Sequence, residues 1–429
     1  MSQRIRSSFG PSIIIAAAVV GTGELVIAPR LGASVGLSAL WLIILGCVIK
    51  VFIQEEIGRH TILTGQTTLE AFNRVPGRLG PMSWAVWCWL PLLFGGTLSM
   101  GGVLAGVIQA MDLLHVPFPG WALAVIVTVM TSIILIAGRY GLIEKAAGVM
   151  VAGFTAMTII ALVLLQRTEF AVSFSQVLGG LRFQMPEHGF ADAVAVFGVT
   201  GIGTSELLFY AYWCLEKGYA KDLATGAPRD PAVVTARVRG MRWDIAVALV
   251  IYTFSTIAFF ILGATILHGA KEVPKGLDMV RTLSQMYTKT FGEWVFYLFA
   301  AGACIVCYST FFVAMATWSR MIADNLRLIS KDRTRFNPRR ATNWTLGVLA
   351  VLYLALFVSF KQTPQWLIVT GGAIQTLTLP LFAIAVLIMR RQRKDPFRPG
   401  RWYDYVLYTT VTIITCAALY SVWGLIPKK

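Results

Sequence analysis

The sequence predicts an all-helical integral membrane protein of about eleven transmembrane helices. Hydrophobic residues occupy 56% of its 429 positions and charged residues only 14%, which is more apolar surface than a water-soluble fold of this size buries. Apolar runs long enough to cross a bilayer, about 17–25 residues each, recur along the whole chain with polar breaks between them. The chain is therefore expected to cross the membrane many times.

Each apolar run defines one predicted span. The first follows a short basic segment, Met1 to Gly10, and contains Glu24 but no small-residue cleavage site. We therefore expect a retained first helix and not a signal peptide. The predicted spans, in order, cover residues 13–30, 35–57, 83–111, 121–138, 145–166, 191–215, 243–267, 291–320, 344–360, 365–389 and 403–426.

The distribution of Lys and Arg predicts the orientation, because cytoplasmic loops retain the positive charge. With the N-terminus inside, the basic clusters at 217–242, 320–340 and 390–401 all fall on the cytoplasmic side. Fewer basic residues fall on the opposite side. We expect a multi-pass protein of the cell inner (plasma) membrane with a cytoplasmic N-terminus and an external C-terminus.

Several other function classes are disfavoured by the sequence. The net charge of +16 lies mostly in short loops beside apolar helices, which indicates topology and lipid contact and not nucleic-acid binding. No Gly-rich phosphate loop is present, and no nucleophile and base stand at a useful spacing for an enzyme. The histidines lack zinc spacing, the C-x-x-C of Cys304 and Cys307 on a membrane helix is expected to serve packing, and we expect no cofactor.

Two segments inside predicted spans resemble each other: residues 21–25 read Gly-Thr-Gly-Glu-Leu and residues 203–207 read Gly-Thr-Ser-Glu-Leu. A carboxylate at mid-bilayer costs roughly 2.5–3.5 kcal/mol on insertion scales, so such acids are usually functional. Glycine, threonine and serine support a continuous helix poorly, and each segment is predicted to interrupt its helix. Breaks at corresponding positions of two spans are typical of a transporter's binding site.

Glu24 and Glu206 are the central candidates for this site. Each falls where a second half-helix would begin, and there the helix dipole favours a carboxylate. If the two carboxylates meet, their repulsion favours a cation or a proton between them. The alternative is that each Glu caps its own half-helix. The other candidate substrate-binding residues are their neighbours, whose hydroxyls serve equally well as helix caps: Gly21, Thr22, Gly23, Gly203, Thr204 and Ser205.

One further charge, Lys50, lies inside the second predicted span, shortly before Gln54 and Glu55. Its long side chain is expected to extend to the cytoplasmic face, which explains it without a role in transport. The alternative is a part in gating or charge compensation.

Several segments resemble the Nramp family of divalent-metal transporters: Gly10-Pro11, Gln54 to Arg59, Thr64 to Thr67, Ala300 to Gly302 and Gln375 to Pro380. The resemblance covers most of the chain. It implies a LeuT-like fold of two inverted five-helix repeats with unwound first and sixth helices. It also implies a single transporter domain over residues 1–429, with repeats at about 11–166 and 191–389 and an extra helix at about 403–426. Gln375 matches a family position that lines the site, which makes it a further candidate substrate-binding residue; the alternative is a hydrogen bond between helices.

The chain departs from the family at the two breaks, which in the family read Asp-Pro-Gly-Asn and Met-Pro-His. Gly21 stands where the family has its metal-binding Asp, Glu24 where it has Asn and Gly203 where it has Met. Without the thioether, the remaining oxygen donors suit Mg²⁺ or Mn²⁺, with Glu24 and Glu206 as candidate metal ligands. The same donors also suit an organic cation, amine or amide.

Proton coupling is open as well. The family relays protons through acids of the third helix, the His of the sixth and basic residues of the ninth. Here the predicted third span has no acid, Ser205 stands near the His position, and Tyr353 is the ionisable group of the ninth span. Either Glu24 and Glu206 carry protons themselves or transport is uncoupled.

We therefore expect a secondary active or facilitative transporter that works by alternating access and moves a hard divalent cation. The alternative is a transporter of a small organic solute on the same scaffold, with the family's metal site lost. A channel or a sensor ranks third, because paired helix breaks are typical of alternating access. The expected partners are the transported solute, membrane lipid and, if transport is coupled, protons. The protein is expected to act as a monomer.

Overall fold

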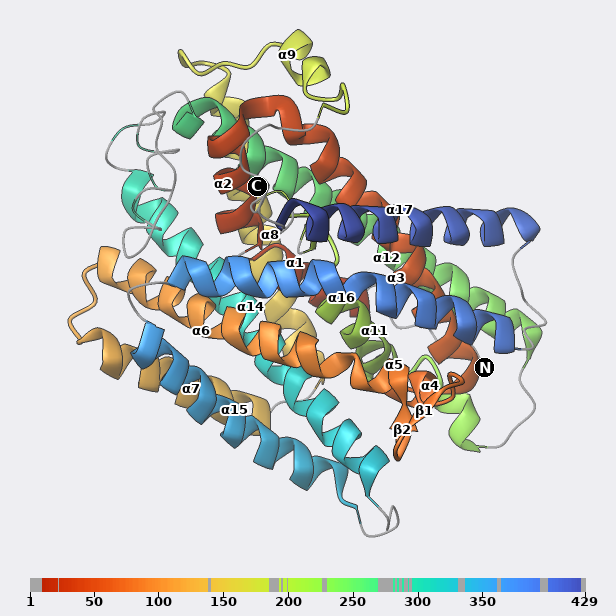
Figure 1. The fold of residues 1–429 in the computed structure, drawn as a ribbon. Coiled ribbons are helices and arrows are strands. Elements are labelled where there is room, and N and C mark those ends of the chain that lie inside the picture. Colours follow the sequence, from red (N-terminus) through yellow and green to blue (C-terminus); the bar gives the residue numbers. More distant parts are fainter. Residues whose placement is uncertain are drawn as a thin grey trace.

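Long helices make up most of the computed structural model (Figure 1). It describes residues 10–21, 23–137, 140–184, 193, 196–198, 200–225, 230–268, 281, 284, 288, 292, 295–330, 336–360, 364–393 and 400–425. The first half contains α1 (Pro11–Val19), the π-helix η1 (Gly23–Ile27), α2 (Ala28–Val35), the 3₁₀-helix η2 (Gly36–Ala39), α3 (Leu40–Thr64), α4 (Thr68–Phe72), β1 (Arg78–Leu79), β2 (Met82–Ser83), α5 (Trp84–Trp87), α6 (Trp89–Leu113), α7 (Gly120–Ala137), α8 (Tyr140–Leu165) and α9 (Phe174–Gly179).

The second half continues the helical pattern. It contains α11 (Thr204–Lys217), the 3₁₀-helix η3 (Lys221–Thr225), α12 (Pro231–Leu262), the π-helix η4 (Gly263–Leu267), α14 (Val295–Ile329), α15 (Pro338–Phe360), α16 (Pro364–Gln392) and α17 (Arg401–Leu425). The two short strands pair antiparallel, with Arg78 opposite Ser83.

Eight helical stretches of the described residues are long and apolar enough to cross a membrane. The stretch Pro11–Thr64 contains two of the expected spans, and the sixth and eleventh expected spans correspond to α11 and α17. Several helices extend beyond the apolar runs. The helix α12 begins at Pro231 and not near residue 243. Its first turns include polar residues, and their backbone hydrogen bonds continue the helix beyond the apolar run. The repeat limits stay a prediction.

Local signals explain where several helices begin and end. Proline occupies the first position of α1, α12, α15 and α16, where its missing N–H costs no intrahelical hydrogen bond. Asp230 caps α12 by accepting from the Ala232 N–H at 2.8 Å. At the other end, α3 stops at Gly65, whose φ of 70° lies in the left-handed region that glycine adopts without strain.

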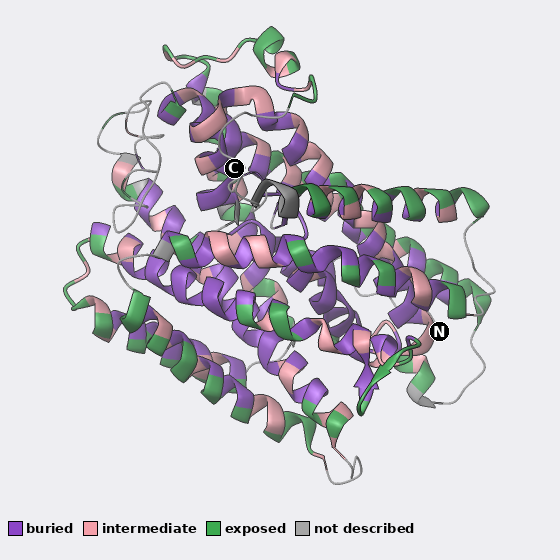
Figure 2. Cartoon of the chain, viewed as in Figure 1, coloured by how far each residue is buried: buried purple, intermediate pink, exposed green. Residues whose placement is uncertain are grey.

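The core lies where α1, α6, α11, α14 and α16 meet. Helices α6 and α16 lie side by side in Figure 1, and α14 packs on the same helix α6. Figure 2 shows buried residues concentrated in these central helices and exposed residues on the outer helices. The outer faces of α7 and α15 are apolar, which suits contact with lipid. They include Trp121, Ile126, Ile133, Trp344, Val351 and Val358.

Both predicted helix breaks are present. In the first span, α1 ends at Val19 and the π-helix η1 begins at Gly23. In the sixth, residues 196–198 are helical and α11 begins at Thr204, with Gly201 at a left-handed φ of 62° between them. The two breaks approach each other, because α1 packs on α11.

Candidate functional site

A small cavity of about 50 Å³ is lined by both helix breaks together with α6, α14 and α16. One water needs about 10–15 Å³ of such volume, so the cavity has room for a few waters or a partly hydrated ion. Its polar side chains come from four helices and all carry oxygen: Ser99, Ser205, Glu206, Thr310 and Gln375.

Glu206 brings the carboxylate to this cavity. It lies in the first turn of α11, where the helix dipole favours a negative charge, and it keeps part of its surface open. The Ser205 hydroxyl donates to Glu206 Oε2 at 2.9 Å or to Gln375 Oε1 at 3.0 Å. A hydroxyl has one proton to donate, so it serves one of these two oxygens at a time. The oxygens of Glu206, Ser205 and Gln375 thus converge. Whichever of Glu206 Oε2 and Gln375 Oε1 does not receive the Ser205 proton is free to bind a cation.

The neighbours of Glu206 fix α11 against α16. The Thr204 hydroxyl donates to the Gln375 backbone oxygen at 2.8 Å, which gives Thr204 a positioning role. Gly203 stands before the first turn, where a Cβ would lie 2.5 Å from Gln375 Oε1 and would also collide with Glu206 Oε2. A side chain at residue 203 would therefore displace the oxygens that line the cavity.

Glu24 points elsewhere. It is fully buried and does not line the cavity. Its Oε1 lies 2.9 Å from the Thr256 hydroxyl of α12, whose one proton serves either this oxygen or the Tyr252 backbone oxygen at 2.7 Å. Its Oε2 accepts from the Gly21 N–H at 3.4 Å. The carboxylate thus caps the break of its own span, although it lies close enough to Glu206 for the two charges to interact.

Helix α14 closes the other side of the first break. Its Ser309 hydroxyl lies 3.0 Å from the Ala17 oxygen, and its Thr310 hydroxyl lies 3.2 Å from the Ala18 oxygen. Each hydroxyl donates its one proton either there or to the Val306 oxygen of its own helix. The Ala17 and Ala18 oxygens belong to carbonyls that the end of α1 leaves without helical partners. A Cβ on Gly21 would collide with Thr310 Oγ1, so residue 21 is glycine because α14 approaches closely. Gly23 begins η1, and Thr22 lies outside the described residues.

Comparisons with known proteins show the family and the fold. A family model described as Natural resistance-associated macrophage protein-like, Nramp, matches residues 12–424. The chain belongs to the Nramp family. It is therefore a multi-pass membrane transporter and not an enzyme.

Relatives of this Nramp chain are distant in sequence. An uncharacterized protein of Pasteurella multocida is 23% identical over 395 residues, covering 83% of this chain and 82% of that protein. A mutant of the Eremococcus coleocola manganese transporter matches with a TM-score of 0.69 at 16% identity, over 99% of this chain and 88% of that chain. MhsT in complex with L-phenylalanine matches with a TM-score of 0.58 at 15% identity, over 98% of each chain. The expected LeuT-like fold is confirmed.

The structure adds cavity residues that sequence reasoning missed. Ser99 and Met100 of α6 and Trp318 of α14 line the cavity of this Nramp protein. The sequence predicted only oxygen donors at this site, but Met100, whose side chain carries a sulfur, is among the lining residues. The sequence did contain one signal for a cavity residue on this helix, the Ser99 hydroxyl inside a Gly-rich apolar run.

Lys50 also differs from expectation. Its side chain does not extend to the cytoplasmic face but is fully buried, and its ammonium donates to backbone oxygens at the break of the sixth span. The interpretation of Lys50 as a residue that reaches solvent is wrong.

A second cavity of about 700 Å³ lies toward the C-terminal ends of α11 and α14 in this Nramp protein. Consecutive residues of α14 line the two cavities: Trp318 lines the small one, and Ser319 and Arg320 line the large one. The Trp318 ring meets the Phe209 ring edge to face, with centroids 5.0 Å apart. Trp318 thus lies between the small cavity and the next residues of α14, which line the large one.

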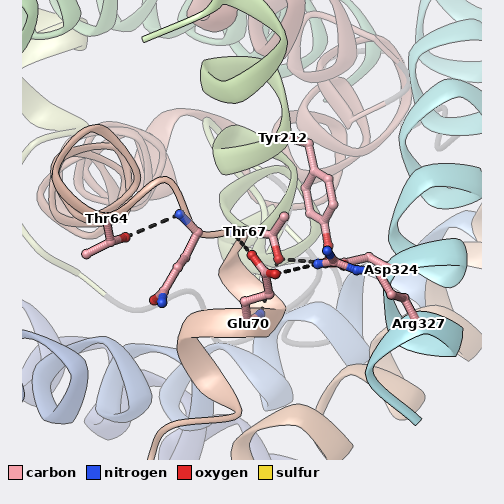
Figure 3. Close-up of polar contacts among 7 residues, drawn as sticks. Thr64, Thr67, Glu70, Tyr212, Asp324 and Arg327 are labelled. Carbon is pink, nitrogen blue, oxygen red and sulfur yellow. Dashed lines mark hydrogen bonds and ion pairs between the residues drawn. The ribbon is translucent and has the colours of Figure 1, made fainter. Parts of the chain in front are cut away.

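A polar network lies on the wall of the larger cavity (Figure 3). Asp324 Oδ2 accepts from the Thr67 hydroxyl at 2.6 Å and from the Tyr212 hydroxyl at 2.8 Å. Its Oδ1 pairs with Arg327 Nη2 at 2.7 Å, and Arg327 also pairs with Glu70. The network joins α4, α11 and α14, so it fixes the far end of the helix that carries Glu206.

Among the described residues, no three His, Cys, Asp or Glu side chains gather where they could hold a metal ion. A metal in this Nramp protein would thus need mixed donors, such as one carboxylate with hydroxyl and amide oxygens. The oxygens of Glu206, Ser205 and Gln375 form such a set.

Proposed function

We propose that this Nramp transporter moves a small divalent cation, Mn²⁺ or Mg²⁺, through the cavity at Glu206 by alternating access. The observation that carries the proposal is the convergence of the Glu206 carboxylate, the Ser205 hydroxyl and the Gln375 amide oxygen on about 50 Å³ of space. Oxygen donors of this kind suit hard cations, and Mg²⁺ keeps several of its waters when it binds.

The size of the cavity favours a cation over an organic solute. Sites for drug-sized molecules have volumes of about 300–1,000 Å³, far more than the 50 Å³ at Glu206. The similar protein from Eremococcus coleocola is a manganese transporter, which also favours a cation. An organic solute stays the alternative if neither metal ion is transported.

Among divalent cations, the lining residues favour Mn²⁺ and tolerate Mg²⁺. Three oxygen side chains suit both ions, and the thioether of Met100 offers a softer donor that only a transition metal uses well. Glu24 acts from the first break by holding its geometry and by adding negative charge, and not as a direct ligand.

We further propose a cytoplasmic N-terminus, an external C-terminus and a monomeric protein in the plasma membrane. The positive-inside rule supports the orientation, because Lys217, Arg320 and Arg390 belong to basic clusters on one side of the predicted topology. If transport is coupled to protons, Glu24 and Glu206 are the groups that would carry them.

The test is uptake of Mn²⁺ and Mg²⁺ by purified protein in liposomes. Wild type should show saturable uptake, and Glu206→Gln should lose it. The matched control is Glu216→Gln on the same helix, because Glu216 pairs with Arg320 away from the small cavity. Uptake that survives Glu206→Gln would refute the site, and uptake of neither ion by wild type would favour the organic-solute alternative.

A further inference from the structure

The ammonium of Lys50 lies at the end of the first half of the sixth span. It donates to the backbone oxygens of Phe197 at 2.9 Å, Gly198 at 3.4 Å and Thr200 at 2.6 Å. Its nitrogen also lies 5.7 Å from the centre of the Phe197 ring. Lys50 comes from the middle of α3 and is fully buried, so its charge is enclosed by protein.

The contacts match the chemistry of an ammonium. A lysine has three N–H donors and no acceptor, and here three carbonyl oxygens receive them. The carbonyl end of a half-helix carries partial negative charge. Lys50 also interacts electrostatically with Glu24 and Glu206. These partners offset part of the high cost of burying a charge away from water.

In transporters that contain discontinuous helices, free backbone carbonyls at a helix break also bind monovalent cations such as Na⁺. In this chain the carbonyls of Phe197, Gly198 and Thr200 are already occupied by a charge that is covalently attached to the protein. A mobile cation at the same carbonyls would meet the Lys50 ammonium and be repelled.

We propose that Lys50 is a tethered cation, which fills a monovalent-cation site at the break of the sixth span and makes the transporter independent of free Na⁺ or K⁺. Its charge also offsets one of the two carboxylates, Glu24 and Glu206. The carbonyls that it occupies are then unavailable to the substrate, which is left with the side-chain oxygens around Glu206. The proposal rests on transport by this fold and not on which cation is carried.

The experiment measures thermal stability of the purified protein in chloride salts of ammonium, methylammonium, Na⁺, K⁺ and choline at equal ionic strength. Lys50→Ala opens room for a small cation at the three carbonyls. Lys50→Met fills the same space without charge. Lys217→Ala is the matched control, because it removes a lysine that pairs with Glu144 at 2.6 Å, away from the break.

We expect the melting temperature of Lys50→Ala to rise by about 2–4 °C in ammonium or methylammonium relative to choline. For wild type, Lys50→Met and Lys217→Ala, the melting temperature of each protein should not differ between ammonium or methylammonium and choline. A folded Lys50→Ala that does not distinguish ammonium from choline would overturn the proposal. So would an equal response by Lys50→Met, which has no space for the ion.

A second measurement does not depend on a variant that folds. Wild-type uptake into liposomes should be unchanged when choline replaces Na⁺ and K⁺ on both sides. A loss of more than twofold would show that a free monovalent cation is required, and the tethered-cation proposal would fail. Because the stability experiment needs no transported substrate, its outcome is separate from the test of Mn²⁺ and Mg²⁺ uptake.

Discussion

Replacing the two intramembrane glutamates one at a time should have unequal effects, because only Glu206 lines the cavity. Glu206→Gln keeps the shape of the side chain but removes its charge. A carboxylate and a divalent cation 4 Å apart attract by about 8 kcal/mol at an effective dielectric constant of 20, and water that enters the site offsets part of this when the charge is removed. Gln keeps one oxygen as a ligand, so we expect a loss of about 2–4 kcal/mol in binding, or about 30- to 700-fold in Kd for Mn²⁺.

Glu24→Gln should instead act on stability. Its carboxylate accepts from the Gly21 N–H at 3.4 Å and shares the Thr256 hydroxyl proton with the Tyr252 backbone oxygen, and an amide oxygen replaces only part of this. We expect a loss of about 1–2 kcal/mol in the free energy of unfolding and a change in Kd of less than about tenfold.

Isothermal titration of the purified protein with Mn²⁺ gives the Kd, and thermal unfolding gives the stability. Glu216→Gln serves as the control for a charge removed elsewhere on α11. The reasoning would be refuted if the two variants lowered affinity equally, or if Glu24→Gln abolished binding while Glu206→Gln did not.

Three further predictions concern the surroundings of the cavity. Met100→Leu should lower Mn²⁺ uptake about three- to tenfold and leave Mg²⁺ uptake unchanged, and equal effects on the two ions in competition assays would exclude a thioether contact. Gly21→Asp should not create a tighter metal site but should lower the melting temperature, because its Cβ would collide with Thr310 Oγ1; tighter Mn²⁺ binding at unchanged stability would contradict this. Asp324→Asn removes the charge that pairs with Arg327 and should destabilise the protein by about 1–3 kcal/mol, with a lower maximal uptake rate and a nearly unchanged Kd; a selective rise in Kd would show that Asp324 binds the substrate.

The sequence predicted the fold well because the signals for it are local. An apolar run of bilayer length forms a helix whatever its neighbours, and glycine with threonine or serine weakens a helix at its own position. The breaks near Gly21 and Gly203 followed from this. Helix ends were predicted less well, as at Pro231, because polar residues continue a helix beyond the apolar run.

The direction of each side chain at the site was not predictable, since it depends on tertiary partners. Glu24 contacts the Thr256 hydroxyl, which lies 232 residues away in the chain. Lys50 is held by carbonyls about 150 residues away. Met100 carries no polar signal at all, and it lines the cavity because α6 packs against α14 and α16.

The central claim is that the transported cation sits among the oxygens of Glu206, Ser205 and Gln375. Anomalous diffraction from crystals grown with Mn²⁺ tests this most directly. We expect one strong peak about 2.0–2.6 Å from the Glu206 carboxylate and the Gln375 amide oxygen, absent in Glu206→Gln. A Mn²⁺ peak at another site, such as the Asp324 network, with none at Glu206 would contradict it.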